Sequence, residues 1–443
     1  MSQSLEQGLF TALARIGLPA ASGLERLSGG ANMESWRFAA GDTVCVLRRA
    51  PSAEMMAGRA LDHAGEAALI RAAHSAGVTA PEVLVELEPD DGLGSGFIMR
   101  ALPGTPDPAA ILAGSEPEQL LRELARELAA IHRVPTGNLP APLMDTAAAL
   151  AELKARFMAN GGDRPVLALA LRWLEANLPT AAEPRLVHGD FRLGNLLVDH
   201  GRLTGVLDWE LAHLGDPHED LAYGCMTVWR FDRPDRAAFG LGPVAALVAA
   251  YQAHGGAPVD PVRLRFWLIY RTFWWALGCL QMGGMWRDHI DRSIERVVVA
   301  RRTAEQELDL LLLLEEQVPQ AERTRLLPVA QPPAEPRRGE PSGAEILTAV
   351  SEWLASDIKP LVSGRGRFDL AVARNALGIV ARELDQRTTA SDPALAADLL
   401  SGTADLTTPG VLARLRRMTL DKLTADMPKY PALAAARAQW EGT

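Results

Sequence analysis

One short region near the middle of the chain constrains the fold more than any other. It reads HGDFRLGN, ending at Asn195, and is followed by LDWE, whose aspartate is Asp208. Between the two motifs, apolar runs at 196–198 and 203–207 flank a polar turn that contains Gly201. Two short apolar runs around such a turn predict a β-hairpin. Because a hairpin returns its end beside its beginning, we expect Asn195 and Asp208 to lie next to each other.

The side chains that this hairpin brings together are suited to a hard cation. Mg²⁺ takes oxygen ligands together with substrate phosphates, so Asn195 and Asp208 are candidate metal ligands. Asp190 begins the same loop and is placed to receive the proton of an attacking hydroxyl group. A base followed a few residues later by a metal-binding Asn is the arrangement of the protein-kinase catalytic loop. A lone His-Gly-Asp is an ordinary turn, but the three residues together predict phosphoryl transfer.

The longer stretch HGDFRLGNLLV…GVLDWELAHLGDPHEDLAY resembles the aminoglycoside phosphotransferase and choline-kinase-like family of small-molecule kinases. The resemblance covers approximately residues 20–315 and is strongest in the second half. It implies an α+β, bilobal protein-kinase-like fold, with a β-rich N-terminal lobe, a helical C-terminal lobe, and ATP and Mg²⁺ between them. It also implies that Asp190 is the catalytic base and that Asn195 and Asp208 bind the metal.

The first part of the chain holds weaker matches to the same family. Gly29 and Gly30 lie in a turn, where residues without a Cβ let the backbone approach a phosphate. The resemblance places the phosphate-binding cation at Arg48 and the glutamate that anchors it at Glu66. The family has Lys at the first of these positions, and a planar guanidinium does not replace a compact ammonium group without consequence. Arg49 is the alternative phosphate-binding residue.

Other candidate site residues are identified by their position relative to these motifs. The segment Arg100-Ala101-Leu102 resembles the hinge between kinase lobes, which implies that backbone groups of Arg100 and Leu102 meet adenine. Arg192 follows the base closely and faces the acceptor or the γ-phosphate, with an exposed structural arginine as the alternative. His132 is expected to be a packing histidine. Asp216 and Asp220 are expected to cap a helix and brace the catalytic loop through hydrogen bonds.

The proline-rich sequence at 326–343 predicts a linker between domains. The predicted domains are an N-terminal lobe at 1–102, a C-terminal lobe at 103–325 and a small all-α domain at 344–443. In the last of these, a helix over 368–384 is expected to bury one stripe, formed by Leu370, Leu377 and Leu384. We find no chemistry-bearing motif there, so the alternatives are an accessory module and a module that forms a homodimer.

Composition excludes several classes of protein. The net charge of −10 argues against nucleic acid as the main partner, because phosphate-backbone binding needs a concentrated basic surface. The widely spaced Cys45, Cys225 and Cys279 predict neither a disulfide framework nor a zinc site and indicate a reducing cytoplasm. The N-terminus lacks a secretory signal. The apolar stretches 266–282 and 310–314 fall short of the roughly twenty apolar residues of a membrane span.

Together these features predict an ATP-dependent kinase that transfers the γ-phosphate to a hydroxyl group of a small molecule. The candidate acceptors are hydroxyacyl-CoA thioesters, aminoglycosides and choline-like amino alcohols. The HGDFRLGN and LDWE motifs look most like those of kinase domains fused to acyl-CoA dehydrogenases, which favours a hydroxyacyl thioester. Two other hypotheses are a non-catalytic nucleotide-binding scaffold, motivated by Arg48, and an enzyme that transfers AMP to a protein.

Overall fold

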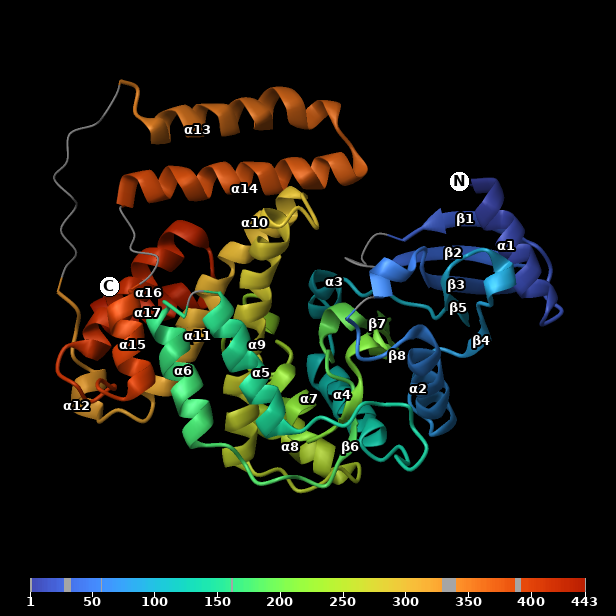
Figure 1. Ribbon diagram of the computed structural model, residues 1–443, viewed down its shortest axis with the longest axis horizontal. Coiled ribbons are helices and arrows are strands. Elements are labelled where there is room, and N and C mark those ends of the chain that lie inside the picture. The colour runs from blue at the N-terminus through green and yellow to red at the C-terminus, as the bar shows by residue number, and fades with distance from the viewer. Residues whose placement is uncertain are drawn as a thin grey trace. The chain divides into compact units, whose positions relative to one another are not determined.

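The computed structural model describes residues 2–27, 33–56, 58–160, 162–328, 340–386 and 392–442 (Figure 1). The turn with Gly29 and Gly30 lies outside these residues. The chain forms two compact units. One comprises Met1–Thr146 and Thr180–Trp267, and the other comprises Ala147–Pro179 and Leu268–Thr443. The domain boundaries that the sequence suggests remain a prediction.

The first unit contains a five-stranded antiparallel sheet in the order β1-β2-β3-β5-β4. Its strands are β1 (Ala21–Arg26), β2 (Glu34–Ala40), β3 (Thr43–Ala50), β4 (Val83–Glu86) and β5 (Ser95–Arg100). Alternation along β3 decides which residues face the site. Cys45 and Leu47 are buried against α1 (Ser2–Ala14), in a core to which Leu9 and Leu13 also contribute. Arg48 therefore points to the opposite face, where α2 (His63–Ser75) lies.

The predicted hairpin is present in the same unit. Strands β7 (Leu196–Asp199) and β8 (Arg202–Val206) pair in antiparallel fashion around the turn with Gly201. The amide of Leu207 donates to the carbonyl of Asn195 over 2.8 Å, so the end of the hairpin returns beside its beginning. A second pair, β6 (Arg185–Val187) with β9 (His213–Gly215), brackets this hairpin and delivers the HGD loop.

Helices complete the first unit. They are α3 (Pro108–Leu112), α4 (Pro117–Ile131), α7 (His218–Tyr223) and α8 (Val244–Ala253). An apolar stripe runs along α4, where apolar residues recur at three- and four-residue steps and all are buried: Leu120, Leu121, Leu124, Leu128 and Ile131. Helix α9 (Pro261–Arg287) begins in the first unit and ends in the second.

The second unit is helical. It comprises α5 (Thr146–Ala159), α6 (Pro165–Ala176), α10 (Ile294–Arg301), α11 (Thr303–Glu315), α12 (Gln320–Arg323), α13 (Gly343–Trp353), α14 (Gly364–Gln386), α15 (Pro393–Ser401), α16 (Val411–Asp426) and α17 (Pro431–Glu441). The buried stripe predicted along α14 is wrong, because Leu384 is 58% exposed and Leu370 and Leu377 are only partly buried. Ile379 and Ala381 are buried instead, because α14 packs against α10, α13 and α16 rather than against one neighbour.

Buried ion pairs join the C-terminal helices to α11. Glu307 of α11 pairs with Lys422 of α16 and, at 3.1 Å, with Arg164. Glu315 receives a hydrogen bond of 2.9 Å from Nε of Arg416, and both side chains are buried. Helix α16, which follows the proline-rich segment, therefore packs on α11 through charged contacts shielded from water.

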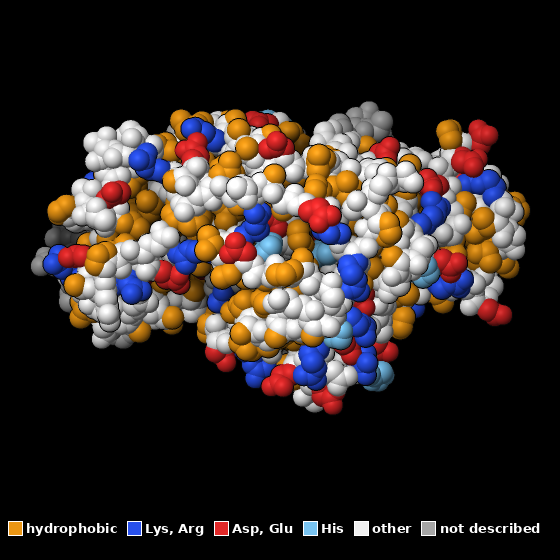
Figure 2. Space-filling model, turned by 90° about the horizontal axis from the view of Figure 1, so that it is seen from below, with side chains coloured by type: hydrophobic (Ala, Val, Ile, Leu, Met, Phe, Trp, Pro, Cys, Tyr) orange, Lys and Arg blue, Asp and Glu red, His pale blue; other side chains and the backbone are white. Residues whose placement is uncertain are grey.

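Other features of the surface and interior bear on the sequence analysis. None of the helices in the described part of the chain is long and apolar enough to cross a membrane. Cys45, Cys225 and Cys279 are buried and free. On the face shown in Figure 2, Lys and Arg side chains are interspersed with Asp and Glu.

Replacing Lys422 with Ala removes one cation from buried Glu307. We expect the free energy of unfolding to fall by about 3 kcal/mol in urea denaturation, because a buried charge loses a partner. Lys154→Ala is the matched control, since the Lys154–Glu175 pair is exposed and should change stability by less than about 1 kcal/mol. Equal losses in the two variants would contradict the assignment of α16 to a charged core.

Candidate active site

The catalytic loop holds the Asp190 carboxylate between two side chains of the same loop. Nδ2 of Asn195 donates to Oδ2 of Asp190 over 2.6 Å, and Nε of Arg192 donates to Oδ1 over 3.1 Å. The Asp190 side chain keeps 13% of its surface exposed, so the carboxylate remains open to a substrate. The arginine also lies over the ring of Trp229, with its guanidinium carbon 4.9 Å from the ring centroid. These contacts fix the carboxylate from two sides.

His188 connects the loop of Asp190 to the segment of Asp208. Its buried ring accepts a hydrogen bond from the Asp190 amide at Nδ1, over 3.2 Å, and its Nε2 lies 3.0 Å from the carbonyl of Leu207. Burial lowers the pKa of His188, so the ring is neutral and one tautomer satisfies both contacts. The same ring therefore sets the spacing between Asp190 and the residue before Asp208.

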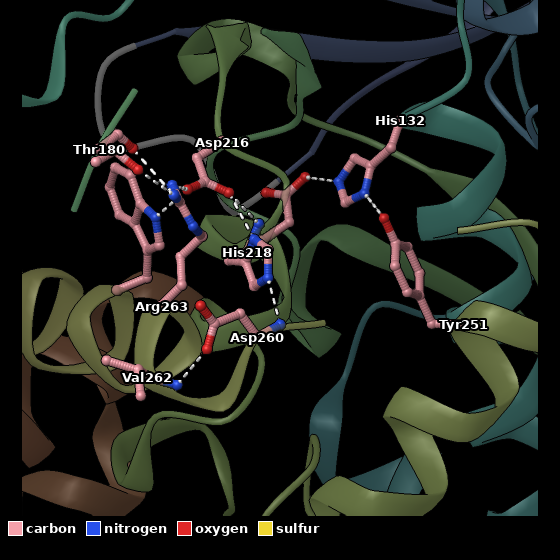
Figure 3. Close-up of polar contacts among 10 residues, drawn as sticks. His132, Thr180, Asp216, His218, Tyr251, Asp260, Val262 and Arg263 are labelled. Atoms are coloured by element: carbon pink, nitrogen blue, oxygen red, sulfur yellow. Dashed lines mark hydrogen bonds and ion pairs between the residues drawn. The ribbon is translucent and has the colours of Figure 1, made fainter. Parts of the chain in front are cut away.

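The carboxylate of Asp220 holds the HGD loop through backbone hydrogen bonds. It is fully buried and accepts the amides of His188 and Gly189 over 2.8 and 2.9 Å. His132 approaches the same carboxylate at 3.1 Å and contacts the Tyr251 hydroxyl at 2.8 Å (Figure 3). Burial would raise the pKa of Asp220, but His132 and the loop amides hold it below its ordinary value. The predicted bracing of the catalytic loop by Asp220 is confirmed, but this residue lies within α7 and does not cap it, and His132 is buried as a packing histidine should be.

Asp216 organises the start of α7 and of α9. Its carboxylate accepts the amide of His218 over 3.0 Å and also receives Arg263 and Trp267 at 2.7 and 2.9 Å. The His218 ring in turn accepts the amide of Asp260 (Figure 3). Burial opposes ionisation of Asp216, but these hydrogen bonds hold its pKa well below the usual range. The predicted helix-capping role is confirmed by the contact with the first amide of α7, and the side chains of Arg263 and Trp267 tie the same carboxylate to α9.

Arg48 joins the sheet to the hairpin. Its Nε lies 3.2 Å from Oε1 of buried Glu66, and its Nη2 lies 2.7 Å from carboxylate oxygens of both Asp208 and Glu210. Arg49, in contrast, binds Glu34 through Nε and Nη2 at 3.0 and 2.8 Å. Of the two arginines, Arg48 is therefore the one that faces the loop residues.

Backbone geometry and burial both act on the carboxylates around Arg48. Asp208 has a left-handed backbone, with φ of 66°, a conformation that short polar side chains adopt more readily than others. Burial, with help from nearby Asp208 and Glu210, raises the pKa of Glu66 to about 7, although Arg48 opposes the shift. Arg48 itself stays charged, because its three carboxylates raise its pKa against the effect of burial.

The donor set fits Mg²⁺ that arrives with a nucleotide. Because Nδ2 of Asn195 faces Asp190, its Oδ1 is left for a cation, and Asp208 adds a partly exposed carboxylate. In the part of the chain that the structure describes, no three His, Cys, Asp or Glu side chains are grouped to hold a metal alone. Such a site suits Mg²⁺, which is usually completed by water and substrate phosphates.

The structure thus gathers most of the residues that the sequence singles out: Arg48, Glu66, Asp190, Arg192, Asn195 and Asp208. Arg100, which the resemblance assigns to the hinge, ends β5, and its amide donates to the carbonyl of Glu82. The roles of Arg100 and Leu102 toward adenine remain predictions. Sequence reasoning missed His188 as a connector and Glu210 as a partner of Arg48. A sequence signal for Glu210 was available, because this residue belongs to the same LDWE motif as Asp208.

Comparisons with known proteins agree with this geometry. Residues 23–267 match the family described as the phosphotransferase enzyme family. The chain is 31% identical over 204 residues to acyl-CoA dehydrogenase family member 10 of Mus musculus, which is 42% of this chain and 19% of that protein. It is 34% identical over 94 residues to aminoglycoside 3'-phosphotransferase of Escherichia coli, which is 21% of this chain and 30% of that protein. The chain thus spans a small part of these relatives.

Solved structures show the same fold. A crystal structure assigned to an aminoglycoside phosphotransferase of Ralstonia eutropha aligns with a TM-score of 0.56 and 21% identity, over 71% of this chain and 98% of the other. Aminoglycoside phosphotransferase APH(4)-Ia, in a ternary complex with AMP-PNP and hygromycin B, gives a TM-score of 0.50 and 20% identity, over 71% and 99% of the two chains. The predicted bilobal kinase-like fold, with extra C-terminal helices, is confirmed.

The fold and the loop residues define a small-molecule phosphotransferase. With more than half of its length matched, the chain belongs to the phosphotransferase enzyme family.

Replacing Asp220 with Asn should lower kcat by roughly 100-fold, because small displacements of catalytic groups cost this much. The amide NH₂ of Asn would face a donor at one of its contacts, either the loop amides or His132. Steady-state kinetics checks the prediction, with Asp199→Asn in the exposed hairpin turn as the matched control. Unchanged kcat in Asp220→Asn would show that the loop keeps its geometry without this carboxylate.

A second prediction concerns pH and Glu66. The folded protein keeps the Glu66 proton up to about pH 7, whereas the ordinary pKa is 4.5. Unfolding therefore releases this proton between those values, and stability must fall as pH rises through the window. Relative to Glu66→Gln, the wild type should lose up to roughly 3 kcal/mol between pH 4.5 and 7.5. Denaturation curves of both proteins across this range provide the measurement, and parallel pH profiles would refute it.

Proposed function

We propose that this protein transfers the γ-phosphoryl group of ATP to a hydroxyl group of a small molecule. The observation that carries the proposal is the joint placement of Asp190, Asn195 and Asp208 on one hairpin-linked loop, within reach of Arg48. Phosphoryl transfer depends mainly on positioning and on electrostatic stabilisation of the phosphates. The contacts of these four residues supply both.

Asp190 orients the acceptor hydroxyl and accepts its proton. Its carboxylate is already oriented by Asn195 and Arg192, over 2.6 and 3.1 Å. Arg192 stays near the base while its guanidinium stacks on Trp229, which places a positive charge beside the position of the transferred group. We assign it to the γ-phosphate or to an anionic part of the acceptor.

ATP and Mg²⁺ are the proposed cofactors. Asn195 and Asp208 would hold the metal, which when bound offsets the charge that develops on the phosphates. Arg48, anchored by Glu66, would hold the non-transferred phosphates, whereas Arg49 is already engaged with Glu34. The complex of APH(4)-Ia with AMP-PNP supports the use of ATP. Gly29, Gly30 and the backbone of Arg100 and Leu102 complete the proposed nucleotide site.

The proposed acceptor is a hydroxyacyl-CoA thioester. Its support is the name of the relatives, acyl-CoA dehydrogenase family members, of which this chain covers only a small part. The second candidate is an aminoglycoside, supported by the Escherichia coli relative and by hygromycin B in the APH(4)-Ia complex. We place the protein in the cytoplasm, without nucleic-acid or membrane partners, and keep a homodimer through the C-terminal helices as a proposal.

The test is ADP release with a panel of hydroxyacyl-CoAs, aminoglycosides and amino alcohols. Asp190→Ala should lower kcat by roughly 100- to 10,000-fold on the best acceptor, because it removes the general base. Asp199→Ala, in the exposed hairpin turn, is the matched control and should retain activity.

The same panel separates the competing hypotheses. ATP labelled in the γ-phosphate should label the acceptor, whereas transfer of the α-label would indicate AMP transfer. Binding of Mg-ATP without turnover on any acceptor would favour a non-catalytic scaffold. Full activity in Asp190→Ala would refute the assigned base.

A further inference from the structure

Arg59 extends the charged cluster around Arg48 beyond the residues that the family motifs indicate. Its Nη1 lies 2.7 Å from Oε2 of Glu210. Nη2 of Arg48 lies 2.7 Å from the same oxygen. One carboxylate oxygen is thus shared by two guanidinium groups. Their side chains are only 18% and 13% exposed, so neither arginine is an ordinary solvated surface charge.

The position of Arg59 places it beside the proposed phosphate site. It follows the 3₁₀ turn Ala53–Met56, between β3 with Arg48 and α2 with Glu66. Its partner Glu210 stands two residues after the proposed metal ligand Asp208 in the LDWE motif. Among the described residues, Glu210 is the one carboxylate within ion-pair distance of Arg59. Arg59 therefore depends on this carboxylate as long as no other anion is bound.

A buried histidine lies near this charged cluster. His63 is buried, with Nδ1 2.9 Å from the hydroxyl of Ser95. Burial lowers its pKa to about 4, and Arg48 and Arg59 lower it further in the same direction. The ring is therefore neutral and adds no third cation. Among the described side chains, Arg48 and Arg59 supply the positive charge beside His63.

The cluster also accounts for an arginine where the family has Lys. An ammonium group has one nitrogen, whereas Arg48 offers Nε to Glu66 and Nη2 to Asp208 and Glu210. If Asp208 binds Mg²⁺ that carries the phosphates of a nucleotide, Nη2 of Arg48 must exchange its carboxylate partners for other anions. Phosphate oxygens bind guanidinium groups well, often in bidentate geometry. Such an exchange leaves no buried cation unpaired at either stage.

We propose that Arg59 is a second phosphate-binding arginine and that Glu210 occupies the place of the phosphate in the nucleotide-free enzyme. Arg59 and Arg48 then grip the ATP phosphates as a pair, and Glu210 competes with the nucleotide for both. This inference rests on the proposed use of ATP, and it adds two residues to that site.

Ligand-binding measurements, which need no catalytic turnover, test whether Arg48 and Arg59 bind the phosphates together. The Kd of ADP in EDTA isolates the arginines from metal ligands, and the Kd of adenosine reports the nucleoside site without phosphates. Arg59→Gln should weaken ADP binding by roughly 10- to 100-fold, the range for charge-assisted hydrogen bonds, and leave adenosine binding unchanged. Glu210→Gln should tighten ADP binding, because it frees both arginines, and this gain should be smaller when the same change is made in the Arg59→Gln background, where Arg48 alone is freed.

Arg71→Gln is the matched control, because Arg71 lies on α2 and pairs with the half-exposed Glu86. It should bind ADP and adenosine as the wild type does. Wild-type affinity for ADP in Arg59→Gln would overturn the inference, as would equal losses of ADP and adenosine, which indicate a structural role. If the wild type binds neither ligand, the proposed use of ATP fails first, and the pair of arginines fails with it.

Discussion

The buried carboxylate of Asp220 is the contact on which the rest of the site depends. It accepts two successive backbone amides, those of His188 and Gly189, and a third contact from His132. A buried acceptor that lost these donors would carry a large desolvation cost, so the loop and the carboxylate stabilise each other. The position of Asp190 follows from this bond, because it is the next residue along the chain.

Two side chains connect that loop to the proposed nucleotide site: the imidazole of His188 and the guanidinium of Arg48. His188 relates the loop to Leu207, and Arg48 relates the next residue, Asp208, to Glu66 on α2. The links from His188 to Leu207 and from Arg48 to Asp208 are hydrogen bonds, and the link from Arg48 to Glu66 is a buried ion pair. The helical unit uses the same principle for another purpose, since Glu307 and Glu315 of α11 hold α16 through buried ion pairs.

Local patterns explain which parts were predictable. The hairpin with Asn195 and Asp208, the stripe on α4 and the capping carboxylate Asp216 all depend on residues near one another in sequence. Strand β1 starts at Ala21, before the strand-like pattern that begins at Glu25, because its residues are half-buried or exposed and do not alternate. The Arg59–Glu210 pair spans 151 residues, and no spacing rule reports such a contact. Leu384 was placed wrongly because periodicity identifies a stripe but not the number of helices that will cover it.

The left-handed backbone of Asp208 limits how this protein can evolve. Chemically, a glutamate offers a magnesium ion the same two oxygens. The longer side chain of glutamate lacks the local hydrogen bonds that let Asp and Asn adopt a left-handed backbone at a lower free-energy cost. For a typical residue this conformation costs about 1–2 kcal/mol. With the metal role proposed for Asp208, selection for metal binding and selection for the turn act on the same side chain, and divergent descendants should retain a short polar residue at this point even after their acceptors have changed.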